Sequence, residues 1–399
     1  MGFWKNYGFT LALLAGLAAG AVCGLVWGEG TAVVRPVGDV FLDVVFVLIV
    51  PLVVFSMSSA AVKVCRSGMA WRLLGTTLGV FVLMSVVAAV LTYILLMLWH
   101  PFEAADPATF LSGLEPEGGG GRVSLKAAVA ASLLPLIGAS VLAGVVIALF
   151  GEKGRRVAEF LDKASALTVR TMQVVMYAAP VCLGCYFAWT VGSLGRTVLG
   201  GYADAVLVYG VAALVVFFLV NSGWVMLCGG KNRLRSYWRG IVPPSLMAVA
   251  TASSAVCLPL GMAAATGMGV RPLVSDSVVP LGTNIHKDGS TMVGVVKVVF
   301  LLGVFGAAAP TWGDMFQVVG VGLLVGMVIG AVPTGGMTGE LLVCTLFGYA
   351  PEMAAILMVF STLIDIPATL LNVAGNVVAA VLTDRLTPAS VRSKGCSGR

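Results

Sequence analysis

Charged side chains are scarce in this chain of 399 residues. Asp, Glu, Lys and Arg make up 11% of it, against roughly a quarter in soluble globular domains. Apolar residues make up 59%, and the mean hydropathy is +1.02. This composition excludes a soluble enzyme, a disordered protein and a nucleic-acid-binding domain. It leaves a polytopic membrane protein in contact with the lipid bilayer, and the length suits about eight spanning helices of ~20 residues each.

Histidine is also scarce, and the motifs of common enzyme sites are absent from the sequence. Only two His occur, neither near a Cys, and there is no His-Glu-x-x-His, nucleophile-elbow or Walker pattern. We therefore expect no enzyme, no cofactor and no dedicated metal cluster. The eight Cys are scattered, mostly in apolar runs, which favours packing over a disulfide framework.

The first apolar run carries a regular glycine pattern. Gly16, Gly20, Gly24 and Gly28 repeat every four residues within or just after the run 9–27. Four glycines on one helix face permit close approach of another helix or of lipid. The run is long enough to span a membrane, so we interpret it as a retained transmembrane helix rather than a signal peptide.

The two halves of the chain differ in pattern. The first half predicts uninterrupted spans, whereas from about residue 241 polar clusters interrupt the apolar sequence. Backbone that leaves helical geometry at membrane depth must be buried in protein or face a water-filled cavity. The clusters therefore favour re-entrant hairpins and unwound helices, as in secondary transporters; the alternative is long helices with kinks. The spans lie near 9–28, 38–62, 73–99, 126–150, 165–192 and 202–228, and the clusters at 251–254, 284–291, 333–336 and 365–376.

The distribution of Lys and Arg predicts topology. If six spans precede the first hairpin, most basic residues fall on one side, and the other side holds only Arg35, Arg122, Lys126 and Arg196. By the positive-inside rule, both termini are cytoplasmic in a multi-pass protein of the cell (inner) membrane. The acidic, glycine-rich stretch 100–125 is then an external loop.

Asp288 and Asp365 are the two acids embedded deepest in apolar sequence. An ionised side chain at bilayer depth costs ~2.5–3.5 kcal/mol on insertion scales, so each requires a reason. His286, Lys287 and Lys297 are the basic or titratable groups of the same half. These residues either form buried ion pairs that fix packing or serve a substrate or ion pathway, which is the default interpretation of intramembrane charge.

A polar stripe marks the last apolar segment. Asp365, Thr369, Asn372 and Asn376 are spaced by four, three and four residues, which places them on one helix face. A carboxylate beside neutral hydrogen-bonding groups suits a zwitterion, because the acid can bind an ammonium while Asn and Thr meet a carboxylate or a cation. The alternative is a polar seam between helices.

A second candidate site precedes this stripe. Pro280 and Gly282 loosen the chain shortly before Asp288, and free carbonyls beside a carboxylate suit a desolvated monovalent cation. The ammonium of Lys287 could take the role of a mobile cation. Adjacent helical residues point about 100° apart, so Lys287 and Asp288 need not touch.

These motifs together resemble the dicarboxylate/amino acid:cation symporter family, which includes the glutamate transporters and the archaeal aspartate transporter. The resemblance covers nearly the whole chain. Each motif is weak alone, but all five occur in order. They are Val50–Phe55; Ser253-Ser254 with Leu258-Pro259; Pro280-Leu281-Gly282 with Asp288-Gly289-Ser290; Val332–Gly336; and Asp365, Thr369, Asn372, Val373 and Gly375.

The resemblance implies an all-α fold of eight transmembrane helices and two re-entrant hairpins with inverted repeats, assembled as a homotrimer. A transport part would slide against a scaffold like an elevator. The expected divisions are 1–72 scaffold helices 1–2, 73–99 transport helix 3, 100–125 external loop, 126–200 scaffold helices 4–5, 201–240 transport helix 6, 241–272 hairpin 1, 273–306 helix 7, 307–350 hairpin 2, 351–385 helix 8 and 386–399 cytoplasmic tail.

The resemblance also assigns roles by position. Asp365 would hold a substrate ammonium with help from Thr369, while Asn372 and the backbone of Ser253 and Ser254 would hold the α-carboxylate. Ser290 and Gly336 would face the substrate side chain. The segment Val332–Gly336, which includes Pro333, would close over it. The cation-coupling set would be His286, Lys287, Asp288, Asn372 and Asn376, with Asp288 and Asn376 as candidate Na⁺ ligands.

Departures from the family pattern alter the expected substrate and ion. Members with acidic substrates carry Arg three residues after the Asp, where this chain has Ala368; a guanidinium–carboxylate pair is worth roughly 1.5–3 kcal/mol. We therefore expect a neutral or otherwise non-acidic amino acid. The alternative is an acidic amino acid or dicarboxylate with Lys287 or His286 as counter-charge.

The ion site departs as well. The family's Asn-Met-Asp-Gly-Thr appears as His286 to Ser290, its terminal Asp as Asn376, and a hairpin serine as Ala255. Coupling to Na⁺, coupling to H⁺ and replacement of a bound ion by a tethered Lys all remain open, as does an uncoupled uniporter or channel.

Overall fold

The computed structural model describes residues 3–66, 71–99, 125–194, 196–305, 310–331, 337–350 and 353–387. Within these ranges the secondary structure is helical and contains no β-strand. This agrees with the composition, because a helix satisfies all of its own backbone hydrogen bonds in a lipid environment. The prediction of an all-α membrane protein is confirmed at this level.

The helices of the first half are long. They are α1 (Phe3–Trp27), α2 (Arg35–Cys65), α3 (Trp71–Trp99), α5 (Leu125–Leu149), α6 (Arg155–Met176), α7 (Ala179–Leu194), α8 (Arg196–Leu214) and α9 (Asn221–Gly240). The second half is more divided: α10 (Val242–Thr251), α11 (Leu258–Gly267), α12 (Pro272–Ile285), α13 (Asp288–Phe305), α14 (Met315–Ala331), α15 (Met337–Leu346) and α16 (Met353–Leu386).

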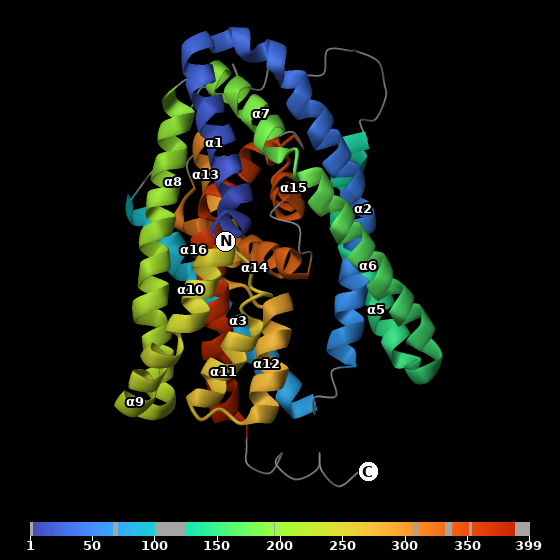
Figure 1. Ribbon diagram of the computed structural model, residues 1–399, viewed down its shortest axis with the longest axis vertical. Helices are drawn as coiled ribbons and strands as arrows, with labels where there is room; N and C mark the ends of the chain where they lie inside the picture. Colours follow the sequence, from blue (N-terminus) through green and yellow to red (C-terminus); the bar gives the residue numbers. More distant parts are fainter. Residues whose placement is uncertain are drawn as a thin grey trace.

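Two groups of helices are visible in Figure 1. An arm of α2, α5 and α6 extends along one side, with α2 packed against both of the others. On the other side lies a bundle centred on α16, which contacts α3, α8, α9, α10, α11, α12, α13 and α15. Most of α16 is buried, so it forms the core around which the divided helices of the second half pack.

The glycine face of α1 packs against α7. A Cβ atom placed on Gly16 would lie 2.1 Å from the carbonyl oxygen of Pro180, and one on Gly20 would lie 2.2 Å from that of Gly184. These distances leave no room for a side chain. The predicted close approach is confirmed, and its partner is a helix of the same chain.

The expected span at 165–192 differs from the structure. The chain bends by 59° between α6 and α7, because Tyr177 and Ala178 form a turn and Pro180 lies in the first turn of α7. Proline removes a backbone donor and clashes with the preceding turn, so a helix breaks before it. The expected single straight helix is therefore two helices.

Helices long and apolar enough to cross a membrane number six among the described residues, or seven if the bent pair counts as one span. Two of these helical runs, Leu11–Cys65 and Leu199–Thr251, contain 55 and 53 residues, whereas one crossing needs about 20. The chain is therefore an integral membrane protein that crosses the bilayer more than once. The finer scheme of eight spans and two hairpins stays a prediction.

Two of the predicted interruptions are confirmed. The helix stops between Thr251 and Leu258, separating α10 from α11, and again at His286 and Lys287, separating α12 from α13. The cluster at 333–336 lies outside the described residues. The cluster at 365–376 does not interrupt its helix, because α16 continues through it despite Pro367. We therefore correct this fourth expected break to a continuous polar stripe.

Candidate functional site

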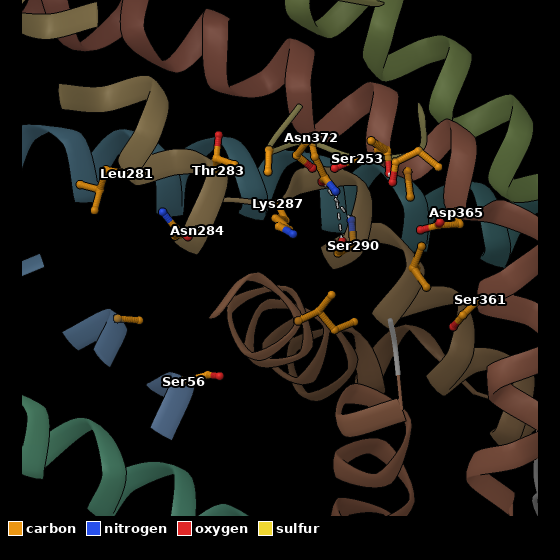
Figure 2. A pocket seen from close by; sticks show the side chains of 18 of the residues that line it. Ser56, Ser253, Leu281, Thr283, Asn284, Lys287, Ser290, Ser361, Asp365 and Asn372 are labelled. Carbon is orange, nitrogen blue, oxygen red and sulfur yellow. Dashed lines mark hydrogen bonds between the residues drawn. The ribbon is translucent and has the colours of Figure 1, made fainter. Parts of the chain in front are cut away.

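A cavity of about 390 Å³ lies where the interrupted helices meet α16. Its lining includes the turn between α10 and α11, the break between α12 and α13, and three of the four residues of the polar stripe. Ser56, Ser59 and Lys63 of α2 border it from the arm. Figure 2 shows the labelled side chains around this space, with Ser56 apart from the others. Segments far apart in sequence thus form one polar pocket.

The stripe on α16 divides between this cavity and the interior behind it. Asp365, Thr369 and Asn372 line the cavity, and Asp365 is exposed to it. Asn376 is 1% exposed and contacts His286 instead. Ala368 also lines the cavity. Its methyl group therefore occupies the position at which the resemblance implies an Arg in members with acidic substrates.

Asn372 and Ser290 fix α16 to the start of α13. The backbone N–H of Ser290 donates to Asn372 Oδ1 at 3.3 Å, and Asn372 Nδ2 donates to Ser290 Oγ at 3.2 Å. Figure 2 shows this pair at the centre of the pocket. An amide nitrogen carries two hydrogens, so Asn372 keeps a donor for a ligand.

The turn between α10 and α11 lies close to the same helix. Thr369 Oγ1 lies 3.5 Å from the carbonyl oxygen of Ala252, and the N–H of Ser253 donates to Thr251 Oγ1 at 3.3 Å. Ala252 has φ +47°, in the left-handed region. Such strain in a non-glycine residue persists only where the surroundings enforce it. Ser253 and Ser254 line the cavity here.

Lys287 and His286 face different environments. Lys287 lines the cavity (Figure 2), and within the described ranges no carboxylate lies within 4 Å of its ammonium. His286 is 2% exposed and stacks on Phe81 with ring centroids 4.4 Å apart. Of the two alternative counter-charges for a substrate, the structure places only Lys287 at the cavity.

His286, Asp288 and Asn376 form a separate buried cluster. His286 Nδ1 lies 3.0 Å from Asn376 Oδ1, and Nε2 lies 2.9 Å from Asp288 Oδ1 without hydrogen-bond alignment. Ser85 of α3 donates to the same carboxylate oxygen at 2.7 Å. A Na⁺ ion held by both Asp288 and Asn376, the candidate ligands that the resemblance implies, would have to occupy the position of the imidazole ring.

Nearby lies a buried ion pair that we did not predict from the sequence. Lys297 Nζ of α13 lies 2.5 Å from Glu340 Oε1 of α15, and both side chains are 0% exposed. Ser361 of α16 donates to the same oxygen. Lys297 and Ser361 also line the cavity. The sequence offered one indication of this pair, namely an acid and a base that lie in two separate apolar runs.

The predicted site residues thus fall into three sets. Ser253, Ser254, Ser290, Lys287, Asp365, Thr369 and Asn372 share the cavity, whereas His286, Asp288 and Asn376 lie behind it. Val332, Pro333 and Gly336 lie outside the described residues. Nowhere in the described ranges do three His, Cys, Asp or Glu side chains gather as a metal site.

A cavity bordered by broken helices and by the polar face of an apolar helix long enough to cross a membrane is typical of secondary transporters. The chain belongs to the sodium:dicarboxylate symporter family, whose model matches residues 9–386.

Curated relatives agree with this assignment. The chain is 25% identical over 406 residues to the proton/sodium-glutamate symport protein of Bacillus subtilis, covering 95% of this chain and 93% of that protein. It is 25% identical over 404 residues to a C4-dicarboxylate transport protein of Rhizobium etli, covering 94% and 88%.

Family membership establishes the general activity. The chain is a cation-coupled membrane symporter of a small molecule, and not an enzyme. The family implies Na⁺ or H⁺ as the coupling ion.

Proposed function

We propose that this symporter imports an amino acid without an acidic side chain. The observation that carries the proposal is the exposure of Asp365 to a cavity in which Ala368, one helical turn further along α16, offers only a methyl group. A carboxylate in a cavity at membrane depth requires a positive partner. The α-ammonium of a substrate supplies that partner.

The remaining lining suits the α-carboxylate of the same substrate. Asn372 retains an amide hydrogen beyond its bond to Ser290, and Ser253 and Ser254 line the same cavity. The ammonium of Lys287 lies on the same cavity. Opposite charges with neutral donors between them complement a zwitterion better than a dicarboxylate, which would be repelled by Asp365.

The proposed mechanism follows the family resemblance. The bundle around α16 would carry the substrate across the membrane as the transport part, and the arm of α2, α5 and α6 would belong to a scaffold that assembles as a homotrimer. The separation of these groups in Figure 1 supports the proposal. We further propose that both termini are cytoplasmic, in the inner membrane of the cell, and that Val332–Gly336 closes over the substrate.

A ligand panel tests the substrate class. We expect neutral amino acids to raise the melting temperature of the purified protein and to enter proteoliposomes against a gradient, whereas glutamate and succinate do neither. Asp365→Asn should abolish both effects, because the ammonium loses its charged partner. Transport that survives Asp365→Asn would contradict the proposed binding site.

A second candidate function is symport of an acidic amino acid, with Lys287 as counter-charge. It is favoured by the position of Lys287 on the cavity and by the names of the relatives. The same panel decides between them: glutamate uptake that Lys287→Met abolishes would establish this candidate. If the substrate is instead an amino acid without an acidic side chain, Ala368→Arg should shift selectivity towards acidic amino acids.

A further inference from the structure

His286 is held by groups from three directions. Its ring stacks on Phe81 of α3, with an interplanar angle of 8°. One ring nitrogen faces Asn376 of α16 at 3.0 Å, and the other faces Asp288, the first residue of α13, at 2.9 Å. The side chain is 1% exposed, so its contacts define its whole environment.

The oxygens around the ring resemble the ligand set of a monovalent cation. The carboxylate of Asp288 supplies charge, the amide of Asn376 supplies a neutral oxygen, and the hydroxyl of Ser85 reaches Asp288 at 2.7 Å. Carboxylate and carbonyl oxygens are the groups that replace water around hard cations. Here the ring of His286 stands between them.

Two glycines make this close arrangement possible. A Cβ atom on Gly375 would lie 2.8 Å from Asp288 Oδ2, and one on Gly282 would lie 2.3 Å from Asn376 Oδ1. Neither position can carry a side chain without displacing the cluster. The backbone around the ring is therefore shaped to bring the two oxygens to it.

The ring fills the space between the two oxygens. Its two nitrogens lie 3.0 Å from Asn376 Oδ1 and 2.9 Å from Asp288 Oδ1. An ion bound to both oxygens would therefore have to displace the ring, which the stacking on Phe81 holds in place.

We propose that the ring of His286 takes the place of a free ion between Asp288 and Asn376. This cluster then binds no Na⁺ from solution, and the coupling ion of the symporter acts elsewhere. The inference goes beyond the proposed substrate and holds whichever substrate is carried. It assigns to His286 the role that the sequence had suggested for Lys287, whose side chain faces the cavity instead.

Substitution of the ring tests the proposal. In His286→Asn the space between Asp288 and Asn376 opens, and we expect NaCl, compared with choline chloride, to raise the melting temperature by about 3–5 °C more than in the wild type. The double variant His286→Asn/Asp288→Asn should lose this gain. Glu159→Gln, which removes an exposed carboxylate of α6, should respond to NaCl as the wild type does.

Two results would overturn the proposal. One is a His286→Asn variant that responds to NaCl no more than the wild type does. The other is a wild-type NaCl response that Asp288→Asn removes, because a free ion would then bind beside the ring. No amino acid is present in these measurements, so they can fail while the proposed substrate stands.

A measurement on the wild type covers the case in which the variants do not fold. The chain has only two histidines, so ¹⁵N-labelled histidine gives few ring signals, and His100→Gln identifies those of His286. We expect the shifts of the ring nitrogens to be the same in NaCl and in choline chloride. Shifts that move on addition of Na⁺ would refute the proposal, because an ion would then bind beside the ring.

Discussion

The Lys297–Glu340 pair places two opposite charges where neither could remain alone. Both side chains are fully buried, and Glu340 Oε2 finds no hydrogen-bond donor among the described residues. Burial of an ion pair gains little over an apolar pair, but loss of one partner leaves an uncompensated charge. The pair connects α13 to α15 beside the cavity, so its integrity affects the packing of the site.

We expect Glu340→Gln to lower the free energy of unfolding by about 3–5 kcal/mol, because it leaves the Lys297 ammonium buried without a counter-charge. The double variant Lys297→Met/Glu340→Leu should recover most of that loss. Thermal or denaturant unfolding of the purified protein measures both.

A matched control is available on the surface. Glu159 pairs with Arg155 at 3.5 Å, and both side chains are more than half exposed. Glu159→Gln should change stability by no more than ~0.5 kcal/mol. Equal losses of stability in Glu159→Gln and Glu340→Gln would show that burial does not determine how much the Lys297–Glu340 pair contributes to the free energy of unfolding.

At the scale of the elements, small residues decide which helices approach each other. α1 and α7 pack so closely that Gly16, Gly20 and Gly24 face backbone atoms of α7 directly. In lipid the hydrophobic effect does not draw helices together, so close van der Waals contact has to do so. The glycine repeat in the sequence identified the face of α1 that packs closely, and the structure identified α7 as the helix that it packs against.

We expect Gly20→Ala to destabilise the protein by roughly 1–3 kcal/mol, because its Cβ would lie 2.2 Å from the Gly184 oxygen and would force α1 from α7. Gly8→Ala on the same helix meets nothing within 4 Å and should leave the melting temperature almost unchanged. Similar melting temperatures for the two variants would contradict close packing at Gly20.

At the scale of the whole molecule, the cavity lies between the arm and the bundle. Its lining joins Ser56 and Ala60 of α2 to the turn between α10 and α11 and to α16. If the bundle moves against the arm during transport, as we propose, a covalent link between the two groups should stop movement and spare binding.

We therefore expect a thiol cross-linker that spans the cavity, applied to Ala60→Cys/Ala255→Cys, to abolish uptake while the amino acid still raises the melting temperature. Both positions line the cavity. The exposed Cys23 and Cys65 should be replaced by Ser beforehand, and each single variant treated with the reagent serves as control. Uptake at the wild-type rate by the fully cross-linked protein would exclude this relative motion.

Local patterns in the sequence were enough for the class of protein, two of the four expected interruptions and the face shared by Asp365, Thr369 and Asn372. These features depend on hydropathy and on helical periodicity, which act over a few residues. The bend before Pro180 is also local, yet the surrounding apolar run obscured it.

Long-range packing decided the rest. Whether His286 or Lys287 meets Asp288 depends on how α3 and α16 pack around the break between α12 and α13. The partner of Lys297 lies on α15, beyond the whole of α14. Side chains adjacent in sequence point in different directions, and the groups they meet come from distant helices, so only the tertiary structure separates the cavity from the buried histidine cluster behind it.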